Sequence, residues 1–155
     1  MPGFQHSIQI DAPTAVAWRL LSQVDQWPRW LPTVSQVKPL GPGTVEPGAR
    51  FVVHQPKLMP ATWVVTDVVP PQSFVWEARS PGVRTRASHA LTPLGPQRCA
   101  LELHFAFSGW LGTPLGLLFA RLTRAYLTQE CAALKAAAER AASGNASGSP
   151  TGDRR

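Results

Sequence analysis

The sequence predicts an α+β domain in which a curved antiparallel sheet of seven strands wraps around one long C-terminal helix. Three observations lead to this prediction. Large and polar side chains alternate in seven segments, the links between the last six segments are short and rich in glycine and proline, and the apolar spacing becomes helical after Gly109. Short links favour antiparallel pairing, because parallel neighbours need a crossover of about a dozen residues or more.

Two short helices are expected after the first strand, which covers residues 4–10. Pro13 suits the first turn of a helix, and the apolar stripe of Val16, Leu20 and Leu21 extends that helix over residues 13–23. Residues 24–32 hold two tryptophans and two prolines, so they are expected to form only a brief helical turn.

The rest of the chain is predicted to be strands followed by a helix. Strands are expected over residues 34–40, 49–55, 61–69, 73–79, 83–91 and 99–107. The helix is expected over residues 114–142, with Thr113 as its N-cap and Pro114 at its first position. One of its faces is apolar and must be covered: Leu115, Phe119, Leu122, Tyr126, Ala133 and Ala137. Residues 143–155 have little to bury, so a disordered tail is expected after a single domain of residues 1–142.

The charge of the chain is strongly positive, with a formal net charge of +6 and a pI near 10.4. The basic residues are mostly scattered, and they form small groups only at Arg79, Arg84 and Arg86 and at Arg121 and Arg124. This scatter is typical of solvated strand and helix faces rather than of a nucleic-acid arm. No nucleic-acid partner is therefore expected.

Metal and cofactor motifs are not found in the sequence. Cys99 and Cys131 have no metal-ligand spacing, and the four histidines have no helical spacing of four. No glycine-rich nucleotide loop follows a strand. The first residues lack the pattern of a secretory signal, and the longest apolar stretch, residues 110–120, is too short to span a bilayer. We expect a cytoplasmic protein with no cofactor, no metal and no stable membrane insertion.

The apolar face of each strand can be assigned to the interior, because strand residues alternate between two faces. Five inward sets result: Leu101, Leu103, Phe105 and Phe107; Val83, Thr85, Ala87, His89 and Leu91; Phe74, Trp76 and Ala78; Trp63, Val65 and Asp67; and Phe51, Val53 and Gln55. These sets mix aromatic bulk with small and polar residues. Such walls are typical of a small-molecule pocket rather than of a tightly filled core.

Several segments of the chain resemble a known family in their order and spacing. They are residues 10–13 (IDAP) followed by Trp18, residues 27–32 (WPRWLP), 55–58 (QPKL), 74–76 (FVW) and 80–83 (SPGV), then His89 and residues 107–109 (FSG). Together they resemble the polyketide cyclase/dehydrase and lipid-transport branch of the SRPBCC (START-like) superfamily, from about residue 4 to residue 142. The resemblance implies a helix-grip fold. It does not imply one reaction, because the superfamily includes lipid carriers, hormone receptors and cyclases.

His89 is the candidate acid or base, since an imidazole in an apolar pocket can move a proton near neutral pH. Asp67 is expected on the same inner face, where it could orient His89 or bind a ligand hydroxyl. The alternatives are a buried histidine satisfied by a neighbour and a solvated carboxylate at a strand end. Ser88 points to the opposite face from His89, so the two cannot form a nucleophile and base pair.

Two further segments each allow two structural roles. Trp27 and Trp30 either form a pocket entrance or wedge against the sheet as core residues. The loop of residues 56–60 places Leu58 and Met59 beside Lys57, as a lid or a membrane-touching loop would. A simple connection between two strands is the alternative for this loop.

The first functional hypothesis is binding or transport of a hydrophobic small molecule, such as a lipid, an isoprenoid or an aromatic polyketide. The candidate ligand-binding residues are Trp27, Trp30, Phe51, Trp63, Trp76, His89, Leu103, Phe105, Phe107, Phe119, Leu122 and Tyr126. The second hypothesis is a polyketide cyclase or dehydratase that uses His89 assisted by Asp67. The third is an interaction module in which Arg79, Arg84 and Arg86 meet an acidic partner. The oligomeric state is left open.

Overall fold

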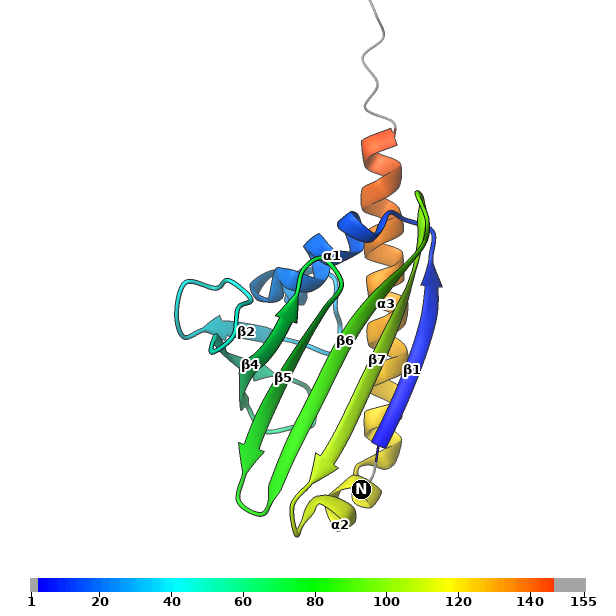
Figure 1. Cartoon of the computed structure of the whole chain (residues 1–155). Helices are drawn as coiled ribbons and strands as arrows, with labels where there is room; N and C mark the ends of the chain where they lie inside the picture. The colour runs from blue at the N-terminus through cyan, green and yellow to red at the C-terminus, as the bar shows by residue number, and fades with distance from the viewer. Residues whose placement is uncertain (1–2, 147–155) are drawn as a thin grey trace, which may run out of the picture.

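One antiparallel sheet of seven strands forms the body of the protein in the computed structural model, which describes residues 3–146 (Figure 1). The order across the sheet is β1-β7-β6-β5-β4-β3-β2, so six consecutive strands form a meander and the first strand pairs with the last. The predicted α+β fold class is therefore confirmed. The strands are β1 (Gly3–Ile10), β2 (Gln36–Pro39), β3 (Arg50–His54), β4 (Ala61–Val69), β5 (Ser73–Ser80), β6 (Val83–Gly95) and β7 (Arg98–Ser108).

Two short helices follow β1, as the sequence predicts: α1 (Thr14–Ser22) and the 3-10 helix η1 (Val24–Arg29). Pro13 stands just outside α1 as its N-cap residue, one position earlier than expected. α1 buries Leu21 and η1 buries Trp27. The indole Nε1 of Trp27 donates a hydrogen bond to the Leu21 carbonyl at 3.1 Å, which ties the two helices together.

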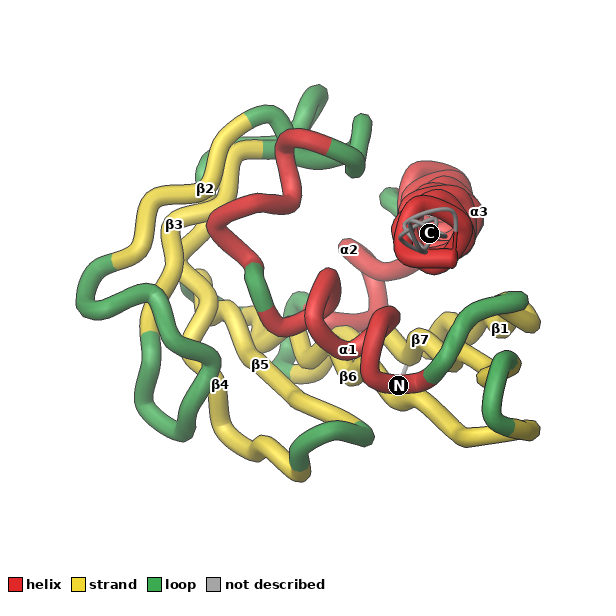
Figure 2. Tube along the Cα trace, turned by 90° about the horizontal axis from the view of Figure 1, so that it is seen from above, coloured by secondary structure: helices red, strands yellow, loops and turns green. Residues whose placement is uncertain are grey.

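The long helix α3 (Ala120–Ala146) lies on the concave side of the curved sheet, together with α1 and η1 (Figure 2). It runs beside β1, where the Cys131 Sγ lies 3.9 Å from the His6 carbonyl. Near the end of β1, the Asp11 amide donates to the Glu139 carboxylate at 3.2 Å. These contacts hold α3 against the β1 edge of the sheet.

The predicted C-terminal helix is two helices rather than one. α2 (Gly112–Leu118) begins after an N-cap at Leu111, not at Thr113, and the helical path is interrupted at Phe119 before α3 starts. The start of α2 lies close to the end of β7: a Cβ atom on Gly112 would lie 3.1 Å from the Phe107 carbonyl carbon, so a larger residue here would require the backbone to shift.

The helical end of the chain extends further than predicted. α3 continues through Ala146, so residues 143–146 are helical and do not belong to a disordered tail. The remainder of the predicted tail, residues 147–155, lies outside the described residues.

The covered face of α3 is rotated slightly from the predicted one. The most buried α3 side chains follow the spacing i, i+4, i+8, i+11 and i+15: Thr123, Leu127, Cys131, Leu134 and Ala138. The predicted face lies one position away, and its N-terminal half (Leu115, Phe119, Leu122 and Tyr126) is only half-buried. The core therefore covers this apolar half of the face only in part, and the same four side chains border a cavity.

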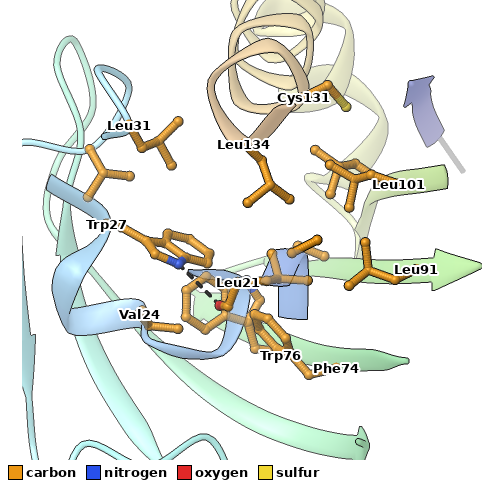
Figure 3. Close-up of a cluster of buried hydrophobic side chains, with 14 of the residues drawn as sticks. Leu21, Val24, Trp27, Leu31, Phe74, Trp76, Leu91, Leu101, Cys131 and Leu134 are labelled. Atoms are coloured by element: carbon orange, nitrogen blue, oxygen red, sulfur yellow. Dashed lines mark hydrogen bonds between the residues drawn. The ribbon is translucent and has the colours of Figure 1, made fainter. Parts of the chain in front are cut away.

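A cluster of buried side chains forms the core where α1, η1 and α3 meet the sheet (Figure 3). Trp27 is 2% exposed and packs at its ring centroid 5.3 Å from Trp76. Leu134 of α3 and Leu101 of β7 approach the same cluster from the other side. Because this dense cluster occupies only one end, the opposite end near α2 can hold a cavity.

Candidate functional site

A cavity of about 250 Å³ lies between the central strands, α2 and the first turns of α3. We call it the main cavity. Its lining residues are Gln55, Leu58, Met59, Ala61, Trp63, Ala78, Ser80, Val83, Thr85, Phe105, Phe107, Leu115, Phe119, Leu122, Thr123, Tyr126, Leu127 and Glu130. Most of these side chains are apolar, and the volume is just below the range of about 300–1,000 Å³ that is typical of small-molecule sites.

A smaller space of about 40 Å³, the inner pocket, continues the main cavity toward the core. The two share five lining residues: Gln55, Trp63, Phe105, Leu127 and Glu130. Trp27, Trp76, His89 and Leu103 border only the inner pocket. The pair of spaces thus forms one elongated site with a wide end at α2 and a narrow end at His89.

His89 is held by aromatic rings at the narrow end. It is 3% exposed, and its ring stacks on Phe74 with centroids 4.2 Å apart and an interplanar angle of 14°. Its Nδ1 lies 3.4 Å from the Phe74 carbonyl oxygen. The tautomer with its proton on Nδ1 can donate to that carbonyl, and in this tautomer the Nε2 lone pair faces the pocket.

The carboxylate that accompanies His89 belongs to Glu130 of α3. Glu130 Oε1 lies 3.7 Å from His89 Nε2, and the side chain of Glu130 is only 16% exposed. This separation exceeds a direct hydrogen bond, so both groups keep capacity for a ligand atom. The sequence hypothesis missed Glu130, although it falls four residues after Tyr126 and three after Leu127, on the helix face that borders the cavity.

Asp67 does not accompany His89 on the inner face; it is a solvated carboxylate, which was the alternative interpretation of this residue. The ladder between β4 and β5 contains a bulge between Val65 and Asp67, and beyond it Asp67 pairs with Val75. One additional residue reverses the alternation of faces, so the parity that put Asp67 beside Val65 fails at this point. Asp67 is exposed, and its carboxylate accepts a hydrogen bond from the neighbouring Thr66 hydroxyl at 2.9 Å.

The other candidate residues divide between the two spaces and the core. Trp63, Phe105, Phe107, Phe119, Leu122 and Tyr126 border the main cavity, whereas Trp27, Trp76 and Leu103 border the inner pocket. Trp30 and Phe51 border neither space. Phe51 is fully buried in the core, and Trp30 packs half-buried against Trp27 with ring centroids 6.2 Å apart.

The β3–β4 loop covers one side of the wide end. Leu58 and Met59 border the main cavity, and Met59 is 86% exposed. The Tyr126 hydroxyl of α3 donates a hydrogen bond to the Pro56 carbonyl of this loop. Burial raises the pKa of Tyr126 above its ordinary value, so its phenol keeps the proton that it donates. The loop is thereby fastened to α3 beside the cavity.

The two thiols are free and buried. Burial raises the pKa of Cys99, and a hydrogen bond with Thr14 partly opposes that rise. Burial and then the negative charge of Glu130 raise the pKa of Cys131 to about 12. Among residues 3–146, no group of three or more histidine, cysteine or acidic side chains is placed to hold a metal ion. Within the same residues, no helix is both long enough and apolar enough to cross a membrane.

The curved sheet, the long C-terminal helix and the apolar space between them define a helix-grip protein with an internal cavity. The family model for polyketide cyclase / dehydrase and lipid transport matches residues 1–139, so the chain belongs to this family. The resemblance found in the sequence is thereby confirmed. A search of curated proteins finds no match to the sequence.

Solved structures share the fold at low sequence identity. The Zhui aromatase/cyclase from Streptomyces sp. R1128 is 17% identical with a TM-score of 0.73, over 89% of this chain and 93% of its own. A Thalictrum norcoclaurine synthase point mutant, in complex with a transition state analogue, is 14% identical with a TM-score of 0.72, over 90% and 94% of the two chains. The di-domain protein StfQ from the steffimycin biosynthetic pathway is 15% identical with a TM-score of 0.73, over 92% of this chain and 52% of its own.

Proposed function

We propose that this protein binds a compact hydrophobic small molecule in the main cavity, as a carrier or sequestering protein for a lipid, isoprenoid or aromatic polyketide. The observation that supports this function best is the cavity of about 250 Å³ between α3 and the sheet, with walls that are mostly apolar. Transfer of apolar ligand surface from water to such walls is favourable by about 25 cal/mol per Å². The family also includes lipid transport in its description.

The polar groups at the narrow end suggest the orientation of the ligand. His89 Nε2 and Glu130 Oε1 lie 3.7 Å apart without a direct hydrogen bond, so a ligand hydroxyl placed between them can donate to one of them. The wide end, near Phe107 and Phe119, is mainly apolar, and its polar side chains such as Ser80 and Thr85 are uncharged. A ligand with one hydrogen-bonding end and an apolar body fits this polarity.

The scarcity of polar groups favours binding over catalysis. The Tyr126 phenol is occupied by the Pro56 carbonyl, so it is not free to polarise a ligand carbonyl. Of the polar residues that remain on the walls, only His89, His104 and Glu130 are ionisable; the others are Gln55, Ser80, Thr85, Ser88 and Thr123. A polyketide cyclase has to position several carbonyl groups, for which this set is small.

One observation favours an enzyme as the second candidate: an imidazole and a carboxylate lie side by side in a secluded pocket. In that function, His89 Nε2 removes a proton from a carbon next to a ligand ketone, and the enolate attacks a second carbonyl of the same molecule. The proton then returns to the alkoxide that forms. Glu130 would stabilise the imidazolium between these steps.

The experiment that tests the binding function starts with native mass spectrometry of the protein purified from its own host, followed by denaturing extraction. A stoichiometric apolar adduct supports the carrier. Leu122→Trp, which places an indole in the main cavity, should abolish the adduct, whereas Ala125→Trp on the exposed side of α3 should retain it. Equal adduct in both variants would overturn the proposal.

A second measurement separates the carrier from the enzyme. The extracted molecule is returned to the protein and analysed again after incubation. An unchanged molecule supports the carrier, and a cyclised or dehydrated product supports the enzyme. In the enzyme case His89→Gln must abolish product formation while the same molecule still binds.

A further inference from the structure

Exposed hydrophobic side chains gather at the end of the molecule where the main cavity is widest. Met59 is 86% exposed, Trp110 80%, Leu117 71% and Leu118 73%. We call these four residues the apolar rim. Met59 borders the cavity itself, and Leu117 and Leu118 lie on α2, whose Leu115 borders it too. Single exposed apolar residues are common, but four of this exposure beside one opening are not.

The part of the rim around Trp110 and α2 is fixed to the β5–β6 turn. The Leu111 amide donates to the Gly82 carbonyl at 2.8 Å, which joins the β5–β6 turn to the segment before α2. A Cβ atom on Gly82 would lie 2.9 Å from the Trp110 ring, so the indole packs directly over this glycine. Trp110 is therefore held in place while most of its surface faces solvent.

The charge at this end is predominantly positive. Residues 55–61, 79–84 and 108–126 form the β3–β4 loop, the β5–β6 turn and the α2 region, and they contain five basic residues and no acidic one. These basic residues are Lys57, Arg79, Arg84, Arg121 and Arg124. Glu77 lies 3.9 Å from both Arg79 and Arg84 and offsets part of their charge.

We propose that the apolar rim and its surrounding basic residues dock this protein peripherally on an anionic lipid bilayer, with the mouth of the main cavity against the membrane. Tryptophan favours the membrane interface, leucine and methionine enter the acyl boundary, and lysine and arginine bind anionic headgroups. A second copy of the chain fits the rim less well, because a symmetric contact would bring the five basic residues of each copy together.

The inference goes beyond the proposed function, because docking uses side chains on the outside of the cavity. It gives the site a route of exchange: a hydrophobic ligand would pass between bilayer and cavity without entering water. The cavity variant Leu122→Trp should therefore lose the ligand and still bind vesicles, which keeps the two proposals separately testable.

The test is flotation of the full-length protein with vesicles of phosphatidylcholine containing a minority of phosphatidylglycerol, compared with phosphatidylcholine alone. We expect binding to the anionic vesicles that weakens with salt. Combined Trp110→Ser, Leu117→Ser and Leu118→Ser should reduce it at least tenfold, as expected for removing three apolar anchors. Lys57→Glu with Arg121→Glu should reduce it more than fivefold per charge.

The matched control is Leu94→Ser with Leu40→Ser, which removes two exposed leucines (48% and 43% exposed) away from the rim. This control should bind like the wild type, and all variants should show unchanged circular dichroism and thermal unfolding. Absence of wild-type flotation, or equal loss in rim and control variants, would overturn the proposal. So would a wild-type dimer in light scattering that the rim variant converts to a monomer, because the rim would then be a protein interface.

Discussion

The imidazole of His89 and the carboxylate of Glu130 face each other at 3.7 Å across the narrow end of the cavity. One comes from the middle of β6 and the other from α3, so the pair bridges the two layers whose separation creates the cavity. His89 is also stacked on Phe74, which means that it serves both packing and polarity at this position. These two roles can be separated by substitution.

The packing role of His89 predicts different costs for two substitutions. His89→Ala removes the ring that stacks on Phe74 and leaves a gap beside Trp27, so we expect a loss of about 2–4 kcal/mol in the free energy of unfolding. His89→Phe keeps an aromatic ring and should cost less than about 1.5 kcal/mol. Urea unfolding measures both. Equal costs would show that the stacking is not what stabilises this position.

Removal of the Glu130 carboxylate is expected to weaken ligand binding, whereas removal of the Asp67 carboxylate is expected to have no effect. Glu130→Ala should weaken retention of a ligand that carries a hydroxyl or amine, by about tenfold, because it removes a partly buried hydrogen-bond acceptor from the inner pocket. Asp67→Ala removes an exposed carboxylate and should change neither ligand binding nor stability by more than about 0.5 kcal/mol. Titration of each variant with the extracted ligand makes the comparison. A binding loss in Asp67→Ala would contradict the assignment of the pair.

The carboxylate beside His89 is Glu130 and not Asp67, and this difference shows how far alternation of side chains predicts the site. Alternation assigned the inner faces of β5, β6 and β7 correctly, because Phe74, His89 and Leu103 lie in uninterrupted ladders. It failed for Asp67, since a bulge leaves no mark in a run of β-branched residues. The seven strands and the long helix were predictable because their apolar periods persist over many residues.

Two other features differ from the prediction: the break between α2 and α3, and the face of α3 that is buried. The apolar spacing of the helix does not determine either of them. The break between α2 and α3 at Phe119 has no glycine or proline at it, so no breaker residue marks it in the sequence. The buried face of α3 is set by the side chains of α3 that pack into the core together with α1 and η1. Glu130 lies on the predicted face, four residues after Tyr126 and three before Ala133, and it was missed because that face was assigned from its apolar side chains alone.

The phenol of Tyr126 is expected to control access to the main cavity. Tyr126→Phe removes the hydrogen bond to the Pro56 carbonyl, so residues 56–60 should exchange amide hydrogens faster and bound ligand should dissociate faster. The stability cost should be only about 0.5–1.5 kcal/mol. Thr128→Val is the control, because its hydroxyl donates only to the Arg124 carbonyl within α3. Unchanged exchange in the loop would show that the phenol does not hold it.

The thiol of Cys131 should be inert in the folded protein. Its pKa is raised to about 12 by burial and by Glu130, so the reactive thiolate is scarce at neutral pH and iodoacetamide should not label it before unfolding. A pKa raised from about 9 means that the folded state holds this proton more tightly than the unfolded state. The resulting stability is present below pH 9 and is lost as the pH rises toward about 12. Cys131→Ala should remove that part of the alkaline decline, and a decline identical to the wild type would assign it to other groups.

The position of α2 depends on the β5–β6 turn, and two glycines allow that dependence to be measured. Gly82 has a φ of +79° and Gly48 a φ of +89°, so alanine at either position is strained in the left-handed region by about 1 kcal/mol. A Cβ at Gly82 would also lie 2.7 Å from the Leu111 side chain, whereas a Cβ at Gly48 meets nothing within 4 Å. Gly82→Ala should therefore destabilise the protein more than Gly48→Ala, and it alone should change the fluorescence of Trp110 and increase amide exchange in α2. If both variants lose the same stability and α2 exchange is unchanged, the contact between this turn and α2 does not fix the wall of the cavity.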